Sequence, residues 1–343
     1  MDADATDQLH MRRAVELSLL SLGETSPNPN VGCVLVGPGG VVGEGRTAPA
    51  GGPHAEVSAL AAAGELARGA TAYVTLEPCD HTGRTGPCTQ ALIAAGVVRV
   101  VIAVRDPNPK AAGGAETLRA AGVTVDLVHS EAAHAAMIGW LTAVGRGTPF
   151  VIWKFAATLD GRSAAADGTS MWITSPQARA DVHRIRAGVD AVIAGIGTVL
   201  ADDPQLTVRT PDGPAARQPL RVVVDGGART PAGARVLDGA APTWIVTTPG
   251  GGRVDLRGML RELYDRGVRT ALLEGGPTLA GAFLAEGLVD RVVAYLAPKL
   301  LGAGPAALTG AGISTIAEAL TLDVVDLATI GPDVRLTATV KGA

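Results

Sequence analysis

The sequence predicts an α/β protein of two domains, each built on strands that alternate with helices. The first observation is a repeated rhythm in which a helix ends at a glycine and an apolar strand follows, at residues 91–104, 116–128, 260–274 and 279–296. The second is the length of 343 residues, more than one core usually supports. The third is a stretch of small residues with a proline at 144–149. We therefore expect domains at residues 1–146 and 147–343.

The elements of the first domain follow from hydrophobic periodicity and from glycine stops. Residues 6–23 repeat apolar positions at helical spacing, and residues 31–36 form a short apolar run typical of a strand. A helix is expected at 54–64 and a strand at 71–76, which leads into a glycine-rich loop. The helix–glycine–strand units then predict mainly parallel strands with helices on their faces.

The second domain is expected to open with a strand at residues 150–161. A loop-rich stretch at 209–219 is interpreted as an internal loop, because strand signals resume at 220–225. At residues 272–281 a strand ends at Glu274, two glycines turn the chain, and Pro277 opens a helix. Backbone N–H groups at such a helix start bind phosphate well, although an ordinary tight junction would look the same.

Composition limits the classes of function. Hydrophobic residues make up 47% and charged residues 18%, which argues against disorder. The net charge of −4 gives no general attraction for nucleic acid or for an anionic membrane. Three cysteines are too few for a disulfide framework, the acidic start is not a secretory signal, and no uncharged apolar run is long enough to span a bilayer. We expect a cytoplasmic protein.

Two of the three cysteines and one histidine have the chemistry of a zinc site. His54 opens a predicted helix, and Cys79 and Cys88 lie in the loop after a predicted strand. A catalytic zinc site takes three nitrogen or sulfur ligands and leaves a fourth position for water. The helix start and the strand end are expected at one edge of the sheet, where ligand sites form. We therefore predict that these three residues bind zinc.

Glu56 is the predicted proton shuttle of this site. It is too close to His54 in the chain to be an independent ligand, but it can reach a water held by zinc and pass a proton to a leaving amine. This is the arrangement of zinc deaminases, except that Cys79 and Cys88 are nine positions apart rather than three. The alternative is a structural site with His81 as a fourth ligand. Cys33 is expected to be a small core residue.

With these residues in place, the chain resembles the bifunctional deaminase/reductase of riboflavin biosynthesis. The resemblance rests on residues 27–32, 77–88 and 105–114 in the first half. In the second half it rests on residues 159–164, 172–179, 195–209, 272–281 and 295–302. It covers nearly the whole chain, with the motifs in the order of the family. It implies a cytidine-deaminase-like αβα domain followed by a dihydrofolate-reductase-like α/β domain.

The family resemblance implies two substrates and two cofactors. The first domain would remove an amino group from 2,5-diamino-6-ribosylamino-4(3H)-pyrimidinone 5′-phosphate with Zn²⁺, and the second would use NADPH to reduce the ribosyl group of the product to ribityl. Asn28, His81 and Arg84 match substrate-side residues of the deaminase, and Arg84 is a suitable phosphate partner. The chain departs from many members at Thr47, where they carry histidine, and at Gly86, where they carry proline.

The resemblance also implies the contacts of the reductase. The residues matched to the cofactor are Ala156, Trp172, Thr198, Asp202, Gly276, Pro277, Thr278, Leu279 and Ala280, the last five forming a pyrophosphate turn. The residues matched to the substrate are Ser170, Arg186, Leu206, Arg209 and Glu274. From the residues alone, the carboxylates and Arg209 would fit a solvated loop equally well. We expect Lys154, on an apolar strand, to stabilise developing charge.

Two other hypotheses compete with this two-step enzyme. One is a zinc deaminase that acts on a nucleic-acid base, and the other is a non-catalytic zinc module that mediates assembly. The absence of a basic, aromatic-rich patch disfavours the first, and Glu56 disfavours the second. We expect small pyrimidine ribose phosphates as partners, no nucleic acid, no membrane, and a homo-oligomer that is a dimer or a tetramer.

Overall fold

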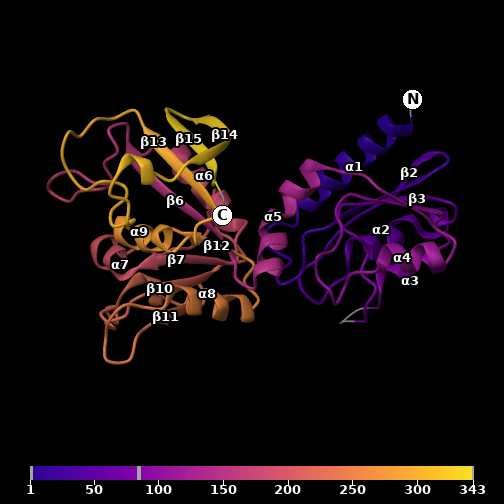
Figure 1. The fold of residues 1–343 in the computed structure, drawn as a ribbon, viewed down its shortest axis with the longest axis horizontal. Helices are drawn as coiled ribbons and strands as arrows, with labels where there is room; N and C mark the ends of the chain where they lie inside the picture. The colour runs from indigo at the N-terminus through magenta and orange to yellow at the C-terminus, as the bar shows by residue number, and fades with distance from the viewer. Residues whose placement is uncertain (1–2, 83–85, 342–343) are drawn as a thin grey trace. The chain divides into compact units, whose positions relative to one another are not determined.

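The computed structural model describes residues 3–82 and 86–341. The chain divides into two compact units, Met1–Gly147 and Thr148–Ala343, and each unit has its own sheet and core (Figure 1). We refer to them as unit 1 and unit 2. The predicted α/β class is confirmed in both units. Within the described part of the chain, no helix is long and apolar enough to cross a membrane.

Unit 1 contains a five-stranded sheet in the order β2-β1-β3-β4-β5. Its strands are β1 (Gly32–Gly37), β2 (Gly40–Arg46), β3 (Thr71–Val74), β4 (Arg99–Ile102) and β5 (Thr124–Leu127). Its helices are α1 (Ala3–Leu19), α2 (Ala55–Ala63), the 3₁₀ turn η1 (Gly64–Ala67), α3 (Cys88–Ala94), α4 (Gly114–Ala120) and α5 (Glu131–Arg146). Helices therefore lie where glycine stops and apolar periodicity predict them.

The sheet of unit 1 is only partly parallel, which corrects the sequence-based expectation. β3, β4 and β5 run parallel, but β1 is antiparallel to both β2 and β3. β2 was not predicted at all, since its glycine-rich sequence lacks a strand pattern. Because β2 and β3 both run opposite to β1, their carboxyl ends lie at the same edge of the sheet. The sheet whose edge carries the predicted zinc ligands is thus mixed rather than mainly parallel as expected.

Two apolar layers enclose this sheet. On one face α1 packs through Met11, Ala14 and Leu17 against strand residues that include Val34 and Tyr73. On the other face lie buried alanines of α2 together with residues of α3, α4 and α5. Cys33 is fully buried in this second layer, as expected for a small core residue. The first unit is therefore a three-layer αβα structure.

Unit 2 contains an eight-stranded sheet in the order β11-β10-β7-β12-β6-β13-β15-β14. Its strands are β6 (Phe150–Thr158), β7 (Ala191–Gly195), β10 (Leu220–Val224), β11 (Thr243–Val246), β12 (Thr270–Leu273), β13 (Arg291–Ala297), β14 (Leu322–Ile330) and β15 (Asp333–Val340), beside a small ribbon of β8 (Arg209–Thr210) and β9 (Gly213–Pro214). The helices are α6 (Pro176–Ala187), α7 (Ile196–Asp202), α8 (Leu256–Asp265) and α9 (Pro277–Ala285), with the 3₁₀ turns η2 (Arg235–Leu237) and η3 (Ile316–Glu318).

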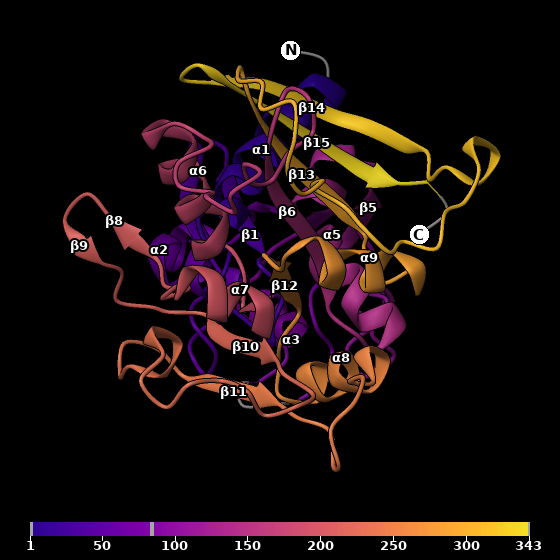
Figure 2. The same ribbon diagram turned by 90° about the vertical axis from the view of Figure 1, so that its left-hand side faces the viewer.

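The six strands from β11 to β13 are parallel, as the alternation predicts, and α8 and α9 cover one face of them. β14 and β15 form a long antiparallel hairpin at one edge, while β11 forms the opposite edge (Figure 2). This hairpin was not predicted. Its outer strand is largely exposed, so it lacks the buried apolar run from which the other strands were recognised.

Two glycines of β2 let α2 lie directly on the strand backbone. A Cβ atom at Gly45 would lie 2.2 Å from the carbonyl oxygen of Ala55 and 2.4 Å from the nitrogen of Ala59. A Cβ at Gly43 would lie 2.3 Å from the Ala59 carbonyl oxygen. These contacts involve helix backbone, which cannot move aside as a flexible side chain can. The packing fixes the start of α2, and with it His54.

We predict that Gly45→Ala lowers the free energy of unfolding of unit 1 by about 1–3 kcal/mol or more, because α2 must shift to accept the methyl group. Gly39→Ala is the matched control, since nothing lies within 4 Å of a Cβ at that position. Chemical denaturation of both variants measures the difference. Equal stability of the two variants would contradict this account of β2.

Candidate active sites

Unit 1 brings the three predicted zinc ligands together. The Nδ1 atom of His54 lies 3.5 Å from the Cys79 sulfur and 3.3 Å from the Cys88 sulfur. One ligand atom from each of the three residues can be chosen so that all lie within 4.8 Å of one another. His54 is the N-cap residue of α2, Cys79 follows β3, and Cys88 is the first residue of α3. Three elements that are separate in the sequence thus converge on one point.

The donor set fits zinc with one position left open. One imidazole nitrogen and two thiol sulfurs form the soft, three-membered set of a catalytic zinc site. His81 is exposed and is not part of the group, so within the described residues the cluster has no fourth ligand. The Cys88 side chain and backbone N–H, together with His54, lower the pKa of Cys79 to about 4. A thiolate at this position is the form that binds a metal.

Glu56 is the second residue of α2 and is only 4% exposed. Burial raises the pKa of its carboxyl group to about 7, and the nearby Cys79 adds to the rise. A carboxyl group with a pKa near neutrality can both accept and donate a proton. The structure therefore places a suitable acid–base group on the helix that begins with a metal-ligand candidate.

Two further carboxylates, missed by the sequence analysis, hold the loop that carries Cys79. Glu77 is buried and accepts hydrogen bonds from the backbone N–H groups of Asp106, at 3.2 Å, and Ala115, at 2.9 Å. Asp80 accepts from the hydroxyl groups of Thr89 on α3, at 2.7 Å, and Thr117 on α4, at 2.6 Å. Their position on either side of Pro78-Cys79 was the signal that could have identified them.

Two of the three predicted deaminase substrate residues, Asn28 and His81, belong to the described part of the chain. Asn28 is half-buried in a loop that closes through hydrogen bonds with Thr25. His81 is exposed, and Arg84 lies outside the described residues. Thr47, where many family members have histidine, is buried and accepts a hydrogen bond from the Val31 N–H at 3.0 Å. Its hydroxyl group thus has a structural partner.

Asp80→Ala is predicted to weaken zinc binding by about 10- to 100-fold, because the Cys79 loop loses its links to α3 and α4. Metal competition with a chromogenic chelator measures the affinity. Glu116→Ala is the control, since within the described residues the ion pairs of that exposed carboxylate on α4 are with exposed arginines. Unchanged zinc affinity in the Asp80 variant would show that the loop holds its shape without these bonds.

Unit 2 contains a buried charge cluster around Glu274, which directly follows β12. Its side chain is 7% exposed and forms a two-point ion pair with Arg186 of α6, at 2.5 and 3.0 Å. The ammonium group of Lys154 on β6 lies 3.7 Å from the same carboxylate. Burial alone would raise the pKa of Glu274, but Arg186 and Lys154 lower it to about 2. Burial lowers the pKa of Lys154.

His183 and Arg209 adjoin this cluster. The Nδ1 atom of His183 accepts a hydrogen bond from the Arg209 N–H at 3.2 Å. Burial, together with the charges of Arg186 and Arg209, lowers the pKa of His183 to about 4, so the ring is neutral at pH 7. No local sequence motif links His183 to Arg209, so this pairing was not predicted.

Other predicted cofactor and substrate residues meet in pairs. The Gly276 N–H donates to the Thr198 hydroxyl at 3.1 Å, joining the start of α9 to α7. The Ser170 hydroxyl donates to Asp202 at 3.2 Å. Gly276 is the N-cap residue of α9, with Pro277 as the first helical residue. The expected helix start is therefore present beside Thr198.

The remaining predicted residues differ in exposure. Ala156 lies two residues after Lys154 on β6, so both side chains point to the same face of the sheet. Trp172 is 60% exposed, and the Arg179 guanidinium lies 4.3 Å from its ring centre. Leu206 and Ala280 are buried, Leu279 is half-buried and Thr278 is exposed. For Ala280 the methyl group belongs to the core.

Family models match both units. Residues 4–104 match the model described as the cytidine and deoxycytidylate deaminase zinc-binding region. Residues 149–336 match the model of the RibD C-terminal domain. The fold and the two sites thus define a zinc deaminase domain joined to a reductase domain.

Relatives match over nearly the full chain. The riboflavin biosynthesis protein RibD of Mycobacterium tuberculosis is 50% identical over 330 residues, which cover 95% of each chain. The Escherichia coli protein of the same name is 44% identical and covers 96% of this chain. A solved structure of Acinetobacter baumannii RibD matches with a TM-score of 0.89 at 41% identity, covering 98% of this chain and 99% of that one.

The chain therefore belongs to the RibD family of riboflavin biosynthesis proteins. It is a bifunctional enzyme, with a hydrolytic deaminase in its first half and a reductase in its second. The predicted two-domain fold class is confirmed. Family membership assigns the deaminase to riboflavin biosynthesis and excludes the alternative of a nucleic-acid-base deaminase.

Proposed function

We propose that this chain catalyses two consecutive reactions. The first is hydrolytic deamination of 2,5-diamino-6-ribosylamino-4(3H)-pyrimidinone 5′-phosphate, by residues 1–146. The second is NADPH-dependent reduction of 5-amino-6-(5-phosphoribosylamino)uracil, by residues 147–343. The supporting observation is the cluster of His54, Cys79 and Cys88 with Glu56 on one chain with a reductase domain. A similar solved structure from Thermotoga maritima, 36% identical, is described as a deaminase/reductase for these substrates.

In the deaminase, His54, Cys79 and Cys88 would hold zinc, which when bound polarises water at neutral pH. Glu56 takes a proton from the attacking water as its oxygen bonds to the ring carbon that carries the amino group. The same carboxyl group then delivers the proton to the departing nitrogen. The C–N bond breaks, ammonia leaves, and the ring carbon becomes a carbonyl.

Asn28, His81 and Arg84 are assigned to the deaminase substrate. The substrate carries a phosphate, whereas the protein has a net charge of −4. Local donors must therefore hold the anion, and a guanidinium group does so with two parallel hydrogen bonds. Arg84 and His81, which lie between the two cysteines in the sequence, are the residues to which we assign this role.

In the reductase, we assign the cofactor to Ala156, Trp172, Thr198, Asp202 and residues 276–280. The helix start at Gly276 supports this assignment, because its N–H groups suit a pyrophosphate. NADPH, when bound, supplies a hydride to the anomeric carbon of the ribosyl group. Ser170, Arg186, Leu206, Arg209 and Glu274 are assigned to the substrate.

Reduction at the anomeric carbon opens the sugar ring, and the ring oxygen that leaves this carbon needs a proton. Lys154 is the acid that we assign to this step. It lies 3.7 Å from Glu274, which holds the ammonium group in place. Burial lowers the pKa of Lys154, so that proton donation becomes easier.

We also propose a cytoplasmic homo-oligomer. The three described cysteines are free thiols, the state that a reducing compartment maintains. Edge strand β14 exposes Val324, Val325 and Leu327, each at least 60% accessible, which is an apolar edge that a second copy could cover. A monomeric mass by light scattering would contradict this oligomer.

A coupled assay that follows ammonia release and NADPH oxidation tests the two-step function. With the diaminopyrimidine phosphate, the parent enzyme should show both signals in sequence. Glu56→Gln should retain zinc but slow ammonia release by about 10²- to 10⁴-fold, because an amide cannot accept the proton. The variant should still oxidise NADPH when given the deaminated substrate.

The control for this variant is Glu65→Gln, which neutralises an exposed carboxylate just after α2. It should behave as the parent enzyme. Ammonia release by Glu56→Gln within about threefold of the parent rate would remove Glu56 from the mechanism. Ammonia release without any NADPH oxidation by the parent would contradict the reductase half.

Lys154→Met should give the opposite pattern. Ammonia release should continue at the parent rate, while NADPH oxidation falls by about 10²-fold or more, because the group that donates the proton is lost. Methionine preserves the length of the side chain, and Arg186 still neutralises Glu274. The exposed Lys341→Met serves as the control. NADPH oxidation at the parent rate would exclude Lys154 as the acid.

A further inference from the structure

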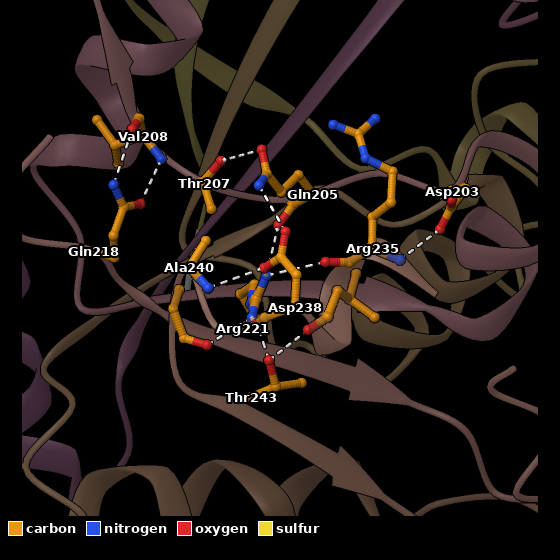
Figure 3. Close-up of polar contacts among 12 residues, drawn as sticks. Asp203, Gln205, Thr207, Val208, Gln218, Arg221, Arg235, Asp238, Ala240 and Thr243 are labelled. Carbon is orange, nitrogen blue, oxygen red and sulfur yellow. Dashed lines mark hydrogen bonds and ion pairs between the residues drawn. The ribbon is translucent and has the colours of Figure 1, made fainter. Parts of the chain in front are cut away.

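Arg221, on β10, is a fully buried arginine whose hydrogen bonds are all satisfied (Figure 3). Its side chain has 0% exposure. Among the described residues, the carboxylate that pairs with it is that of Asp238, at 2.7 Å. Its other acceptors are the Thr243 hydroxyl group and four backbone carbonyl groups. An arginine in this setting acts as a fixed fork of donors that joins separate stretches of backbone.

The four carbonyl groups belong to two different loop segments. Nη1 donates to the carbonyl oxygens of Gln205 and Arg235, each at 3.2 Å. Nη2 donates to those of Asp238, at 2.6 Å, and Ala241, at 2.5 Å. Gln205 lies in the segment 203–209 that follows α7, and the other three lie in the stretch that begins with η2 and ends before β11. Arg221 thus ties the segment after α7 to the segment before β11.

Side chains strengthen the same connection (Figure 3). Asp238 accepts a hydrogen bond from the Gln205 side-chain amide at 2.7 Å, and Gln205 in turn accepts from the Thr207 hydroxyl at 3.1 Å. Asp203 accepts from the backbone N–H of Arg235 at 2.8 Å. Asp238 therefore binds Arg221 with one oxygen and the segment 203–209 with the other.

The segment 203–209 needs such support because of its backbone conformation. Asp203 has φ = 39° and Leu206 has φ = 53°, in the left-handed region that residues with a side chain rarely adopt. Such a conformation persists only where surrounding contacts hold it. Arg221 and Asp238 are both hydrogen-bonded to Gln205, which lies between these two residues in the chain. These hydrogen bonds are the contacts that hold this shape on the side of β10.

The segment also contacts the charge cluster of the reductase. The Thr207 carbonyl oxygen accepts from Arg186 at 3.0 Å, and Arg186 is the partner of Glu274. Val208 is fixed by Gln218, which accepts from its N–H at 2.7 Å and donates to its carbonyl at 2.9 Å. A continuous set of contacts therefore runs from Arg221 through the segment to Arg186.

We propose that Arg221 is a positioning residue of the reductase, which holds the segment 203–209 in the shape that binds the pyrimidine ribose phosphate. This inference rests on the proposed function, which assigns Leu206 and Arg209 of this segment to the substrate. Arg221 itself touches neither substrate nor cofactor. It acts through the backbone of Gln205 and through Asp238.

A purely structural role would not require this residue. Replacing a buried ion pair with apolar residues of similar volume is often neutral or stabilising, so burial alone does not explain an arginine at this place. What an apolar residue cannot supply is the set of donors that fixes two loops relative to β10. The expected consequence of its loss is a displaced substrate segment, and a misplacement of about 1 Å can cost about 10²-fold in rate.

The test measures steady-state kinetics of the full-length enzyme with 5-amino-6-(5-phosphoribosylamino)uracil and NADPH. Arg221→Met should raise KM for the pyrimidine substrate at least tenfold and lower kcat/KM by about 10²-fold. The dissociation constant of NADPH should stay within twofold, because the Gly276 N–H at the start of α9 is held by Thr198 of α7. KM does not depend on how much of the enzyme is folded, so simple destabilisation would leave it unchanged. Ammonia release reports that unit 1 is intact.

Arg269→Met is the matched control, since this arginine also donates to backbone carbonyls, those of Tyr264 and Val268, away from the segment. It should leave KM unchanged even if it lowers the melting temperature. Arg221→Lys keeps the charge but has fewer donors, so KM should lie between the parent and Arg221→Met values. Arg269→Met shows the effect of lost stability, and Arg221→Lys shows the effect of losing guanidinium donors while the charge is kept.

Gln205→Ala and Asp238→Ala test the same idea if Arg221→Met does not fold. Each should raise KM for the pyrimidine at least threefold, and the double variant should show less than the product of the two effects, because both remove one connection. Parent-like KM in these variants, or in a folded Arg221→Met, would overturn the inference. No NADPH oxidation by the parent would instead contradict the proposed function, so the two failures are distinct.

Discussion

A buried carboxyl group must either be neutralised by nearby positive charge or keep its proton, and this constraint shapes both sites of the chain. Glu274 is neutralised: Arg186 and Lys154 surround it, and its pKa falls to about 2. Glu56 lies among thiols and apolar groups, and burial raises its pKa to about 7. One glutamate is therefore a permanent anion that holds cations in place. The other readily exchanges a proton, which is what deamination requires.

Both carboxylates lie near the end of a β-strand. One directly follows its strand, and the other is on a helix that begins beside the strand end. Glu274 directly follows β12, and Glu56 lies on α2, whose start is close to the end of β3 through His54 and Cys79. Backbone donors and acceptors become available where strand pairing stops, so loops there can be held by side chains. Glu77 and Asp80 do this after β3, as Arg221 and Asp238 do beside β10.

Local chemistry explains why some features were predictable and others were not. The cysteines, His54 and Glu56 were identified because their residue types and the surrounding strand and helix signals point to one reaction, and family resemblance extended this to the second half. β2 escaped because glycines required by the close approach of α2 remove its strand pattern. β14 escaped because its apolar residues are exposed. Arg221 and His183 gain their roles from segments distant in sequence, which no local pattern reveals.

The charge of the substrate connects these observations in unit 2. The ribose phosphate must be held by cations in a protein of net charge −4. Arg186 is already committed, with two hydrogen bonds to Glu274 and one to the Thr207 carbonyl. Arg209 is exposed, and its backbone N–H is fixed by His183. Under the proposed function, Arg209 would be the group that meets the phosphate. Arg209 is the last residue of the segment that Arg221 and Asp238 hold. The position of its side chain therefore depends on Arg221, a buried arginine that never touches the substrate.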